Sequence, residues 1–422
     1  MKAVVCILLS SLLVAPSFSV VVEQVFITTT GLVGEMAVSW VTQTGAAASE
    51  EVFYGLSPSA LTASATGASS VLSVEMAVPI RVHIAVMTDL APNTKYFYQV
   101  GGNVTTFSFI NEPSRLGGKT YAVYADLGLA SDYALTSLLA DAANGAFDAV
   151  AHAGDFCYNL EDSGGAAGNA FMNGISPIIS TVPFYVVAGN HETMSDNSFA
   201  HYLARFAAAG KLGENSGNPG ADAARWNSFD DGLVHWVQID TEIYSYGTDA
   251  QIAAQKAWLA ADLAAVNRTK TPWVLSQGHK GYYESPKTDW GVLGISEPFA
   301  DANVDIYFTG HTHNYQRSAA FANEAASDVE CLTGNVYTNC KGTIAILAGS
   351  PGMDQGMGTR LMPKDILEKV IYAWGYGKLT VCNATHLHWQ WFEVAAARSN
   401  ISFAIPWGQS DVSDEAWVVR TA

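Results

Sequence analysis

The chain has 422 residues, of which 49% are hydrophobic and 14% charged, a composition that is typical of globular proteins and excludes disordered and fibrous classes. Its 39 acidic residues outnumber its 21 basic ones and give a formal net charge of −18, which disfavours a nucleic-acid partner or an anionic membrane surface. A chain of this length exceeds one ordinary hydrophobic core, so two domains are expected.

The first nineteen residues, 1–19, have the pattern of a secretory signal peptide. Lys2 precedes an apolar stretch from Ala3 to Val14, and the small residues Ser17 and Ser19 suit a cleavage site. The stretch is too short to span a membrane comfortably, and no later apolar run reaches spanning length, so a signal anchor is the weaker interpretation. We expect a secreted, extracellular protein, or one delivered to an endomembrane or vacuolar lumen. Four Asn-X-Ser/Thr triplets agree with a glycoprotein: Asn103, Asn267, Asn383 and Asn400.

Residues 20–112 have a β pattern throughout. Glu35–Val41 alternates between polar and apolar residues, Val52–Pro58 runs into a turn, and Tyr96–Val100 is aromatic and β-branched. Turn residues at Ala91–Thr94 separate two such segments. This pattern predicts an all-β sandwich, followed by a linker at residues 113–118.

After residue 119 the pattern changes to short buried strands that alternate with helices. Seven apolar runs have strand length: Tyr121–Tyr124, Ala149–Ala153, Phe184–Ala188, Val234–Ile239, Trp273–Leu275, Ile306–Phe308 and Ile344–Ala348. Two sets of residues each share one helical face: Leu135, Leu138 and Leu139, and then Ile252, Leu259, Leu263 and Val266. The alternation predicts an α/β domain over residues 119–394, and residues 395–422 are expected to form a C-terminal tail.

Five of these runs end in short polar clusters. The clusters are Ala125-Asp126-Leu127-Gly128, Gly154-Asp155-Phe156-Cys157-Tyr158, Gly189-Asn190-His191-Glu192, Gly278-His279-Lys280 and Gly310-His311-Thr312-His313. Each cluster alone is ordinary turn chemistry, but sites in α/β folds gather beyond the carboxyl ends of strands. Together the clusters supply hard oxygen and borderline nitrogen donors, which suit a trivalent iron beside a divalent metal. They therefore predict a two-metal site.

These clusters resemble those of the purple acid phosphatases, a family of the metallophosphoesterase superfamily. The resemblance covers nearly the whole mature chain and includes Trp226–His235 and Gly377–Trp389. It implies a two-domain fold, in which a fibronectin-III-like β-sandwich precedes an α/β metallophosphoesterase domain. That second domain would have two packed mixed sheets flanked by helices, an αββα arrangement.

The same resemblance implies a role for each ligand. A ferric ion would be held by Asp126, Tyr158 and His313, a divalent zinc, iron or manganese ion by Asn190, His279 and His311, and both ions by the bridging Asp155. A trivalent ion can keep a tyrosine deprotonated far below its free pKa of about 10. His191 follows a predicted ligand directly, so it is expected to act in catalysis, on the phosphate or the leaving group. The alternative is that it only supports the metal ligands from behind them, without contacting the substrate.

The implied function is a secreted, metal-dependent acid phosphatase that hydrolyses phosphate monoesters. A metal-bound hydroxide would attack phosphorus in line, and the substrate would be a small phosphate ester attracted by the metals, because the protein itself is negative. One alternative is a related phosphoesterase that hydrolyses phosphodiesters, nucleotides or phytate with the same metals. A less favoured alternative is a non-catalytic secreted binding module whose functional part is the β domain.

The cysteines fit an oxidising compartment, since Cys6 would leave with the signal and Cys331 and Cys340 flank a polar loop that a disulfide would close. Cys157 lies between the oxygen donors Asp155 and Tyr158, so it is either a packed thiol or a partner of Cys382, and not a metal ligand.

Departures from the family concern the rim of the site. Thr288-Asp289 stands where plant-type members have a His-His pair, and Ala125 stands where many members have glycine. Rim residues or ordinary loop residues are the two readings of Lys280, Tyr282 and Tyr283. Arg317 either supports the site or forms a structural ion pair. The remaining histidines are expected to be packed or surface residues: His83, His152, His201, His235, His386 and His388.

Overall fold

A computed structural model of the chain describes residues 21–45, 49–112, 118–128, 133–218, 222–281, 294–322, 325–326, 329–352, 356–362, 364–394 and 410–421. The expected signal peptide, most of the linker, Asn400 and the candidate rim residues Tyr282, Tyr283, Thr288 and Asp289 lie outside the described residues. No helix in the described ranges is long and apolar enough to cross a membrane.

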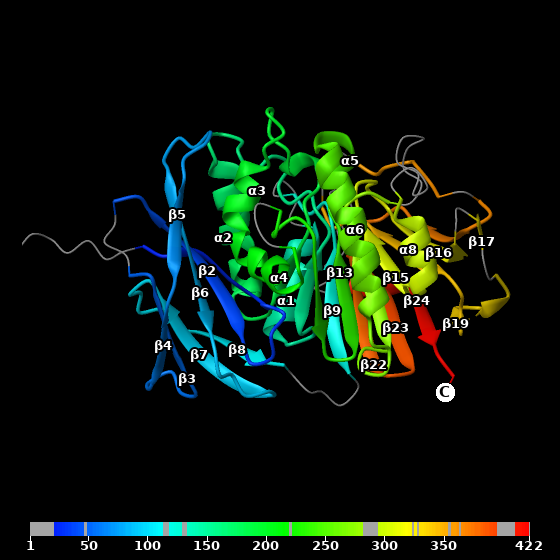
Figure 1. The fold of residues 1–422 in the computed structure, drawn as a ribbon, viewed down its shortest axis with the longest axis horizontal. Helices are drawn as coiled ribbons and strands as arrows, with labels where there is room; N and C mark the ends of the chain where they lie inside the picture. The colour runs from blue at the N-terminus through cyan, green and yellow to red at the C-terminus, as the bar shows by residue number, and fades with distance from the viewer. Residues whose placement is uncertain are drawn as a thin grey trace, which may run out of the picture.

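The N-terminal domain is a sandwich of two four-stranded antiparallel sheets (Figure 1). One sheet has the order β1 (Glu23–Thr28), β2 (Met36–Gln43), β6 (Ile80–Met87) and β5 (Ala68–Leu72). The other has the order β4 (Ala63–Thr66), β3 (Glu51–Gly55), β7 (Thr94–Val100) and β8 (Phe107–Asn111). Alternate residues of both sheets, such as Val38, Trp40, Val52 and Tyr98, face each other in a buried core. The predicted β-sandwich is confirmed.

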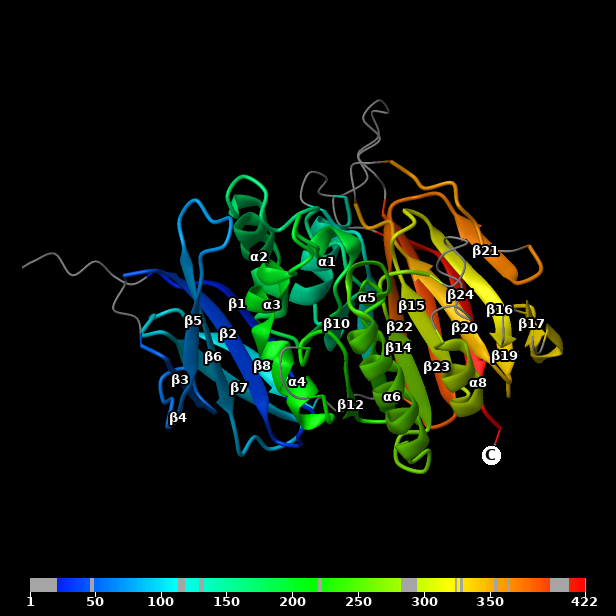
Figure 2. The ribbon, with the colours of Figure 1, turned by 45° about the horizontal axis from the view of Figure 1, so that its top comes forward.

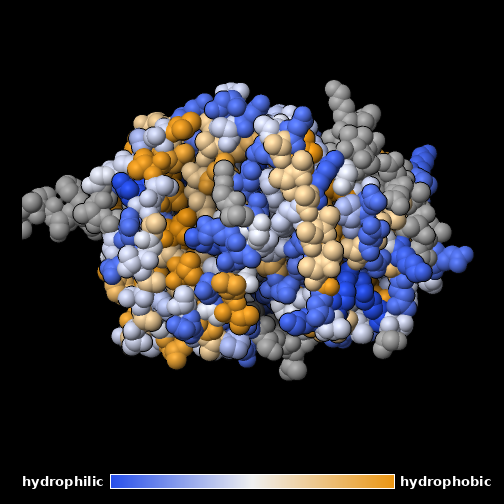
Figure 3. Space-filling view, viewed as in Figure 1, coloured by the Kyte–Doolittle hydropathy of each residue, from blue (hydrophilic) through white to orange (hydrophobic). Residues whose placement is uncertain are grey.

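On the face shown in Figure 3, hydrophobic residues gather more over this domain than at the opposite end of the molecule. Its exposed apolar side chains include Val33, Leu56, Val78 and Val104. Single exposed apolar side chains are ordinary on protein surfaces, so the domain core is defined by the buried set alone.

The second domain contains two eight-stranded mixed sheets. The first sheet has the order β11 (Phe184–Val186), β10 (Ala149–His152), β9 (Lys119–Tyr124), β22 (Gly375–Asn383), β23 (His386–Val394), β24 (Ser410–Val419), β19 (Val336–Thr338) and β18 (Leu332–Thr333). The second has the order β12 (Asn227–Asp231), β13 (Val234–Gln238), β14 (Trp273–Gln277), β15 (Ile306–Thr309), β20 (Thr343–Ala348), β16 (Tyr315–Ala322) and β17 (Ala325–Ala326), with β21 (Leu367–Ile371) beside β16. All seven predicted strand runs coincide with strands of these sheets.

The two sheets pack face to face through aromatic side chains. Tyr121 and Trp236, one from each sheet, have ring centroids 5.1 Å apart, and Phe308 lies 5.4 Å from Trp389. Helices cover the outer faces (Figures 1 and 2): α1 (Tyr133–Ala143) and α2 (Ala166–Ile179) on the first sheet, and α6 (Asp249–Ala265) and α8 (Ser296–Ala302) on the second. This is the expected αββα arrangement.

Shorter helices lie in the connections between strands. They are α3 (Ala200–Arg205), α4 (Gly210–Asn215) and α5 (Ile243–Tyr246), together with the single 3₁₀ turns η1 (Asn190–Glu192), η2 (Ala207–Ala209) and η3 (Val329–Cys331).

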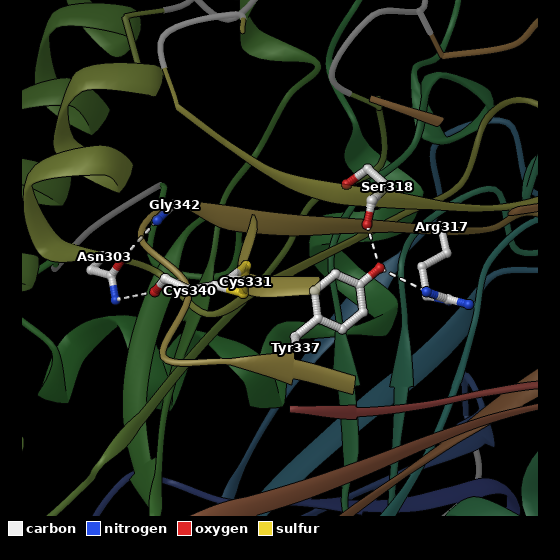
Figure 4. Close-up of a disulfide and its surroundings, with 7 residues drawn as sticks. All are labelled: Asn303, Arg317, Ser318, Cys331, Tyr337, Cys340 and Gly342. Atoms are coloured by element: carbon white, nitrogen blue, oxygen red, sulfur yellow. Dashed lines mark hydrogen bonds between the residues drawn. A yellow bond between two sulfur atoms is a disulfide. The ribbon is translucent and has the colours of Figure 1, made fainter. Parts of the chain in front are cut away.

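The segment expected to be a C-terminal tail contains β24, a strand inserted between β23 and β19. A buried ion pair holds it in place: the Arg317 guanidinium donates to both carboxylate oxygens of Asp414, at 2.8 and 3.0 Å. Arg317 also donates to the Tyr337 hydroxyl, which donates to the Ser318 carbonyl (Figure 4). Of its two sequence readings, the structural ion pair is therefore the one that the structure supports.

The predicted disulfide between Cys331 and Cys340 is present, and it closes the β18–β19 hairpin beside this network (Figure 4). The Asn303 side chain bonds the backbone of Cys340 and Gly342 next to it. Cys157 and Cys382 are both free, so the reading that paired them is wrong.

The histidines outside the clusters have packing partners. His83 stacks on Trp40 with ring centroids 5.0 Å apart, and His388 stacks on Trp417 at 4.1 Å. His152 is buried among aromatic rings, and burial lowers its pKa to about 3. These three histidines are therefore packed imidazoles, as expected.

Candidate metal centre

The polar clusters follow strands β9, β10, β11, β14 and β15, whose carboxyl ends lie at one end of the two packed sheets. Four of the predicted ligands leave their strands in the left-handed region, with φ of 58° at Asp126, 51° at Asp155, 57° at Tyr158 and 69° at His311. This conformation is uncommon for residues that carry a side chain, and it marks a sharp local turn of the backbone at each of these positions.

Close approach of the backbone segments requires glycine beside the ligands. A Cβ on Gly154 would lie 2.6 Å from the Gly189 nitrogen and 2.8 Å from Nδ1 of His279. A Cβ on Gly189 would collide with the Asp155 carboxylate. The glycines that precede the ligands therefore let three loops meet around one point.

Asp126, Tyr158 and His313 converge as the sequence predicts. The Tyr158 hydroxyl lies 3.3 Å from Oδ1 of Asp126 and 2.9 Å from Nε2 of His313, and this Nε2 lies 3.4 Å from the same Asp126 oxygen. Burial, and then the negative Asp126, raise the pKa of Tyr158. The phenol therefore keeps its proton unless a strongly charged cation replaces it.

Asn190, His279 and His311 converge beside them. Nε2 of His279 lies 3.2 Å from Oδ1 of Asn190, and ligand atoms of Asp155, His279 and His311 all lie within 4.8 Å of one another. Nδ1 of His279 is 2.8 Å from the Ala153 carbonyl, so it carries a proton, and Nε2 is the nitrogen that would bind a metal. Burial, and then His279, lower the pKa of His311 to about 3, which leaves its ring neutral, as metal binding requires.

Asp155, the predicted bridging ligand, contacts the second group directly, and its charge acts on Asp126 and Tyr158 of the first group. Its Oδ2 is 3.2 Å from Nε2 of His279, and its Oδ1 accepts a hydrogen bond from the backbone of His191 at 2.9 Å. Burial opposes ionisation of this carboxyl, but His279 outweighs it and holds the pKa of Asp155 below its usual range. The carboxyl group of Asp155 is therefore an anion.

Glu192 is a residue of this site to which the sequence reading gave no role. It is 1% exposed, and its carboxylate accepts from the backbone of Asp155 and Gly189 at 2.8 Å and from Phe156 at 3.0 Å. It ties the loop of Asp155 to the loop of Asn190. Its place two residues after a ligand was the available signal.

His191 lies at the edge of the ligand set. Its ring is partly exposed, lies 4.6 Å from the Tyr158 ring and has Nδ1 3.1 Å from Oδ1 of Asn159. Lys280, in contrast, is 8% exposed and forms an ion pair with the buried Glu242 at 2.8 Å. The reading of Lys280 as a rim residue is therefore wrong, because its ammonium group points into the protein.

The donor set fits two unlike metals. Asp126 and Asp155 are almost fully buried carboxylates, which need cations to offset their charge, and Tyr158 adds a third potential anion on one side only. The other side has a neutral amide and two imidazoles. A trivalent ion suits the first side and a divalent ion the second.

Comparisons with known proteins agree with this geometry. The purple acid phosphatase N-terminal domain matches residues 22–111, the calcineurin-like phosphoesterase family matches residues 84–315, and the iron/zinc purple acid phosphatase-like protein C family matches residues 342–400. Acid phosphatase type 7 of Danio rerio is 30% identical over 404 residues, covering 87% of this chain and 86% of that protein. The Homo sapiens protein of the same name is 29% identical over 433 residues, covering 94% and 91%.

A solved purple acid phosphatase from yellow lupin (Lupinus luteus) seeds has the same fold. It superposes with a TM-score of 0.74 at 20% identity, over 95% of this chain and 75% of the lupin chain. Fold, ligand geometry and sequence relatives thus agree over both domains. The chain belongs to the purple acid phosphatases, a family of metal-dependent acid phosphatases with a dinuclear metal centre.

Proposed function

We propose that this chain is a secreted phosphatase that hydrolyses small phosphate monoesters with a ferric and a divalent ion. The observation that carries the proposal is the asymmetry of the site, where Tyr158 contacts Asp126 and His313, while His279 contacts Asn190 and Asp155. When bound, two such metals neutralise the phosphate oxygens and lower the pKa of water.

The side chains around the metals have separate tasks in this proposal. Asp126, Tyr158 and His313 would hold the ferric ion, Asn190, His279 and His311 the divalent ion, and Asp155 both. His191, at the partly exposed edge of the set, would bind the phosphate or give a proton to the departing oxygen. Glu192 keeps the two ligand loops in register through its three backbone hydrogen bonds.

Secretion is supported by three independent features. Residues 1–19 have the signal-peptide pattern, and the Cys331–Cys340 disulfide is of a kind that persists in oxidising compartments. Two glycosylation triplets have exposed asparagines: Asn267, in the connection after α6, and Asn383, the last residue of β22. We propose that both asparagines carry glycans.

The test is metal content, the visible spectrum and turnover of p-nitrophenyl phosphate by the purified protein. We expect about two metals per chain and a visible absorption band from the tyrosinate–iron contact, lost in Tyr158→Phe together with at least about tenfold in kcat. Tyr372→Phe, which changes a half-exposed tyrosine far along the chain, is the matched control and should keep both.

Three outcomes separate the parts of the proposal. A colourless, active protein that contains only zinc would contradict the ferric ion and leave the hydrolase. A protein that stays inactive after metal reconstitution would contradict both. Faster turnover of bis(p-nitrophenyl) phosphate or phytate than of the monoester would replace monoesters by another ester class.

A further inference from the structure

The turn between β5 and β6 of the β-sandwich, residues 73–79, docks on the loop that follows Tyr158. The Ala77 nitrogen donates to the Gly164 carbonyl at 2.9 Å. Next to it, Met76 lies against Gly165, which has φ of 80°, and a Cβ at this glycine would collide with the Met76 sulfur. The N-terminal domain therefore contacts the loop after Tyr158 through a hydrogen bond and a tightly packed side chain.

Arg205 of α3 also connects the two domains at this contact. It is 2% exposed, and its guanidinium donates to the Gly165 carbonyl at 3.2 Å, to Asn169 at 2.9 Å and to Gln24 of the β-sandwich at 3.0 Å. These acceptors are all neutral. A buried cation with neutral acceptors needs every one of them, because it has given up its water. Displacement of either domain would leave this charge poorly satisfied.

The opposite end of this loop carries Asn159, one residue after the ligand Tyr158. The amide nitrogen of Asn159 donates to Asp162 at 3.2 Å, so its Oδ1 faces the ring of His191. Nδ1 of His191, 3.1 Å away, must then carry a proton and donate it to Asn159. The other ring nitrogen, Nε2, takes no part in this contact.

Hydrogen bonds within the loop, residues 159–165, connect its two ends. The Asp162 nitrogen donates to the Asn159 carbonyl at 3.2 Å, and the Gly165 nitrogen donates to the Glu161 carbonyl at 2.8 Å. Leu160, next to Asn159, is fully buried in the core. The hydrogen bonds connect Gly165 to Asn159 over six residues, so a shift at Gly165 would be felt at Asn159.

We propose that Asn159 is the positioning residue of His191, and that the β-sandwich fixes Asn159 through Met76 and Ala77. The N-terminal domain then contributes to the active site, although none of the predicted ligands belongs to it. The kinetic consequence rests on the proposed phosphatase function, since it is read through turnover.

A double-mutant cycle tests this proposal. Asn159→Ala should lower kcat for an alkyl phosphate, whose poor leaving group needs a well-placed proton donor, about 10- to 100-fold, with KM changed less than about threefold. Met76→Ala should lower kcat about three- to tenfold, and Met76→Leu, which refills the space, should restore it. In the double variant the Met76 effect should vanish, because its target is already gone.

Hydrogen exchange of the full-length, metal-loaded protein supplies a second readout that needs no turnover. Met76→Ala should speed amide exchange in residues 159–168, and the control Val78→Ala, which changes a side chain that is 60% exposed on the same turn, should not. Metal content should stay at the wild-type level in all variants.

Additive kinetic effects in the double variant, or a Met76→Ala protein with wild-type kcat, would overturn the proposal. Faster exchange at 159–168 with unchanged kcat would also overturn it, since the contact would then be structural only. A wild-type protein that holds no metal or hydrolyses no ester would instead contradict the proposed function, while the exchange result would still report on the contact.

Discussion

At the residue scale, His235 shows how a buried ring can make stability depend on pH. Its Nδ1 lies 2.7 Å from Asp230 and its Nε2 3.0 Å from Asp262, so the two carboxylates hold both ring nitrogens. Burial disfavours the charged ring, but these hydrogen bonds outweigh it and raise the pKa of His235 to about 9.

Because the folded pKa lies above the unfolded value of about 6.5, the charged ring stabilises the fold fully below pH 6.5, and this contribution is lost as the pH rises through 9. His235→Gln should therefore lower the free energy of unfolding by about 2 kcal/mol more at pH 6 than at pH 10. Urea unfolding at the two pH values measures the difference. For His388→Gln, which removes a ring 3.4 Å from an exposed carboxylate, the change in the free energy of unfolding should be similar at the two pH values. An equal loss for His235→Gln at both pH values would refute the assignment.

The candidate metal ligands are the residues for which sequence and structure agree best. Their strand-end positions and the family resemblance pointed to them, and the structure brings Asp126, Tyr158 and His313 together. Neighbours such as Glu192 and Lys280 were harder, because their roles depend on which backbone or carboxylate they meet across the fold. No local pattern contains that information.

At the scale of elements, a buried ion pair ties β24 to β16. Asp414 is 6% exposed, and Arg317 holds both of its oxygens. Asp414→Ala should lower the free energy of unfolding by about 3–5 kcal/mol, because it leaves a buried guanidinium without its anion. Glu415→Ala, which changes the next and largely exposed carboxylate, should cost less than about 1 kcal/mol. Chemical denaturation measures both, and similar losses in the two variants would count against the ion pair as the anchor of β24.

The strands that the sequence predicts are those with continuous apolar runs, such as β9 and β15, which are buried on both faces. β24 escaped prediction because its segment begins with Asp411, Asp414 and Glu415 and resembles an acidic, solvated end. Its identity as a strand depends on β23 and β19, between which it pairs. Long-range pairing of this kind is invisible to a local pattern.

At the scale of the whole molecule, the two domains share a core. Phe26 of β1 is 2% exposed and packs with Phe184 and Phe206 of the catalytic domain, with ring centroids 6.4 and 6.1 Å apart. The Tyr98 hydroxyl donates to the Ser180 carbonyl at 2.7 Å across the same boundary. We infer that the domains unfold together, as a single cooperative unit.

Calorimetry of Phe26→Ala tests this cooperativity. The variant should lose about 3–5 kcal/mol, and one heat-absorption peak should move as a whole to lower temperature. Phe53→Ala, which changes a side chain that is 37% exposed on β3, should move the peak much less. Two separate peaks, of which only one moves, would show that the domains unfold independently.

Four candidate ligands have a left-handed backbone conformation, which bears on the evolution of the family: Asp126, Asp155, Tyr158 and His311. Each non-glycine residue in this conformation costs about 1 kcal/mol or more, and glycine would relieve most of that cost. Selection for metal binding must therefore keep opposing a stabilising substitution at four positions. In lineages that lost hydrolysis but kept the fold, we expect glycine to accumulate there first. In an alignment of the family, the residues at these four positions would then distinguish active enzymes from members that have lost activity.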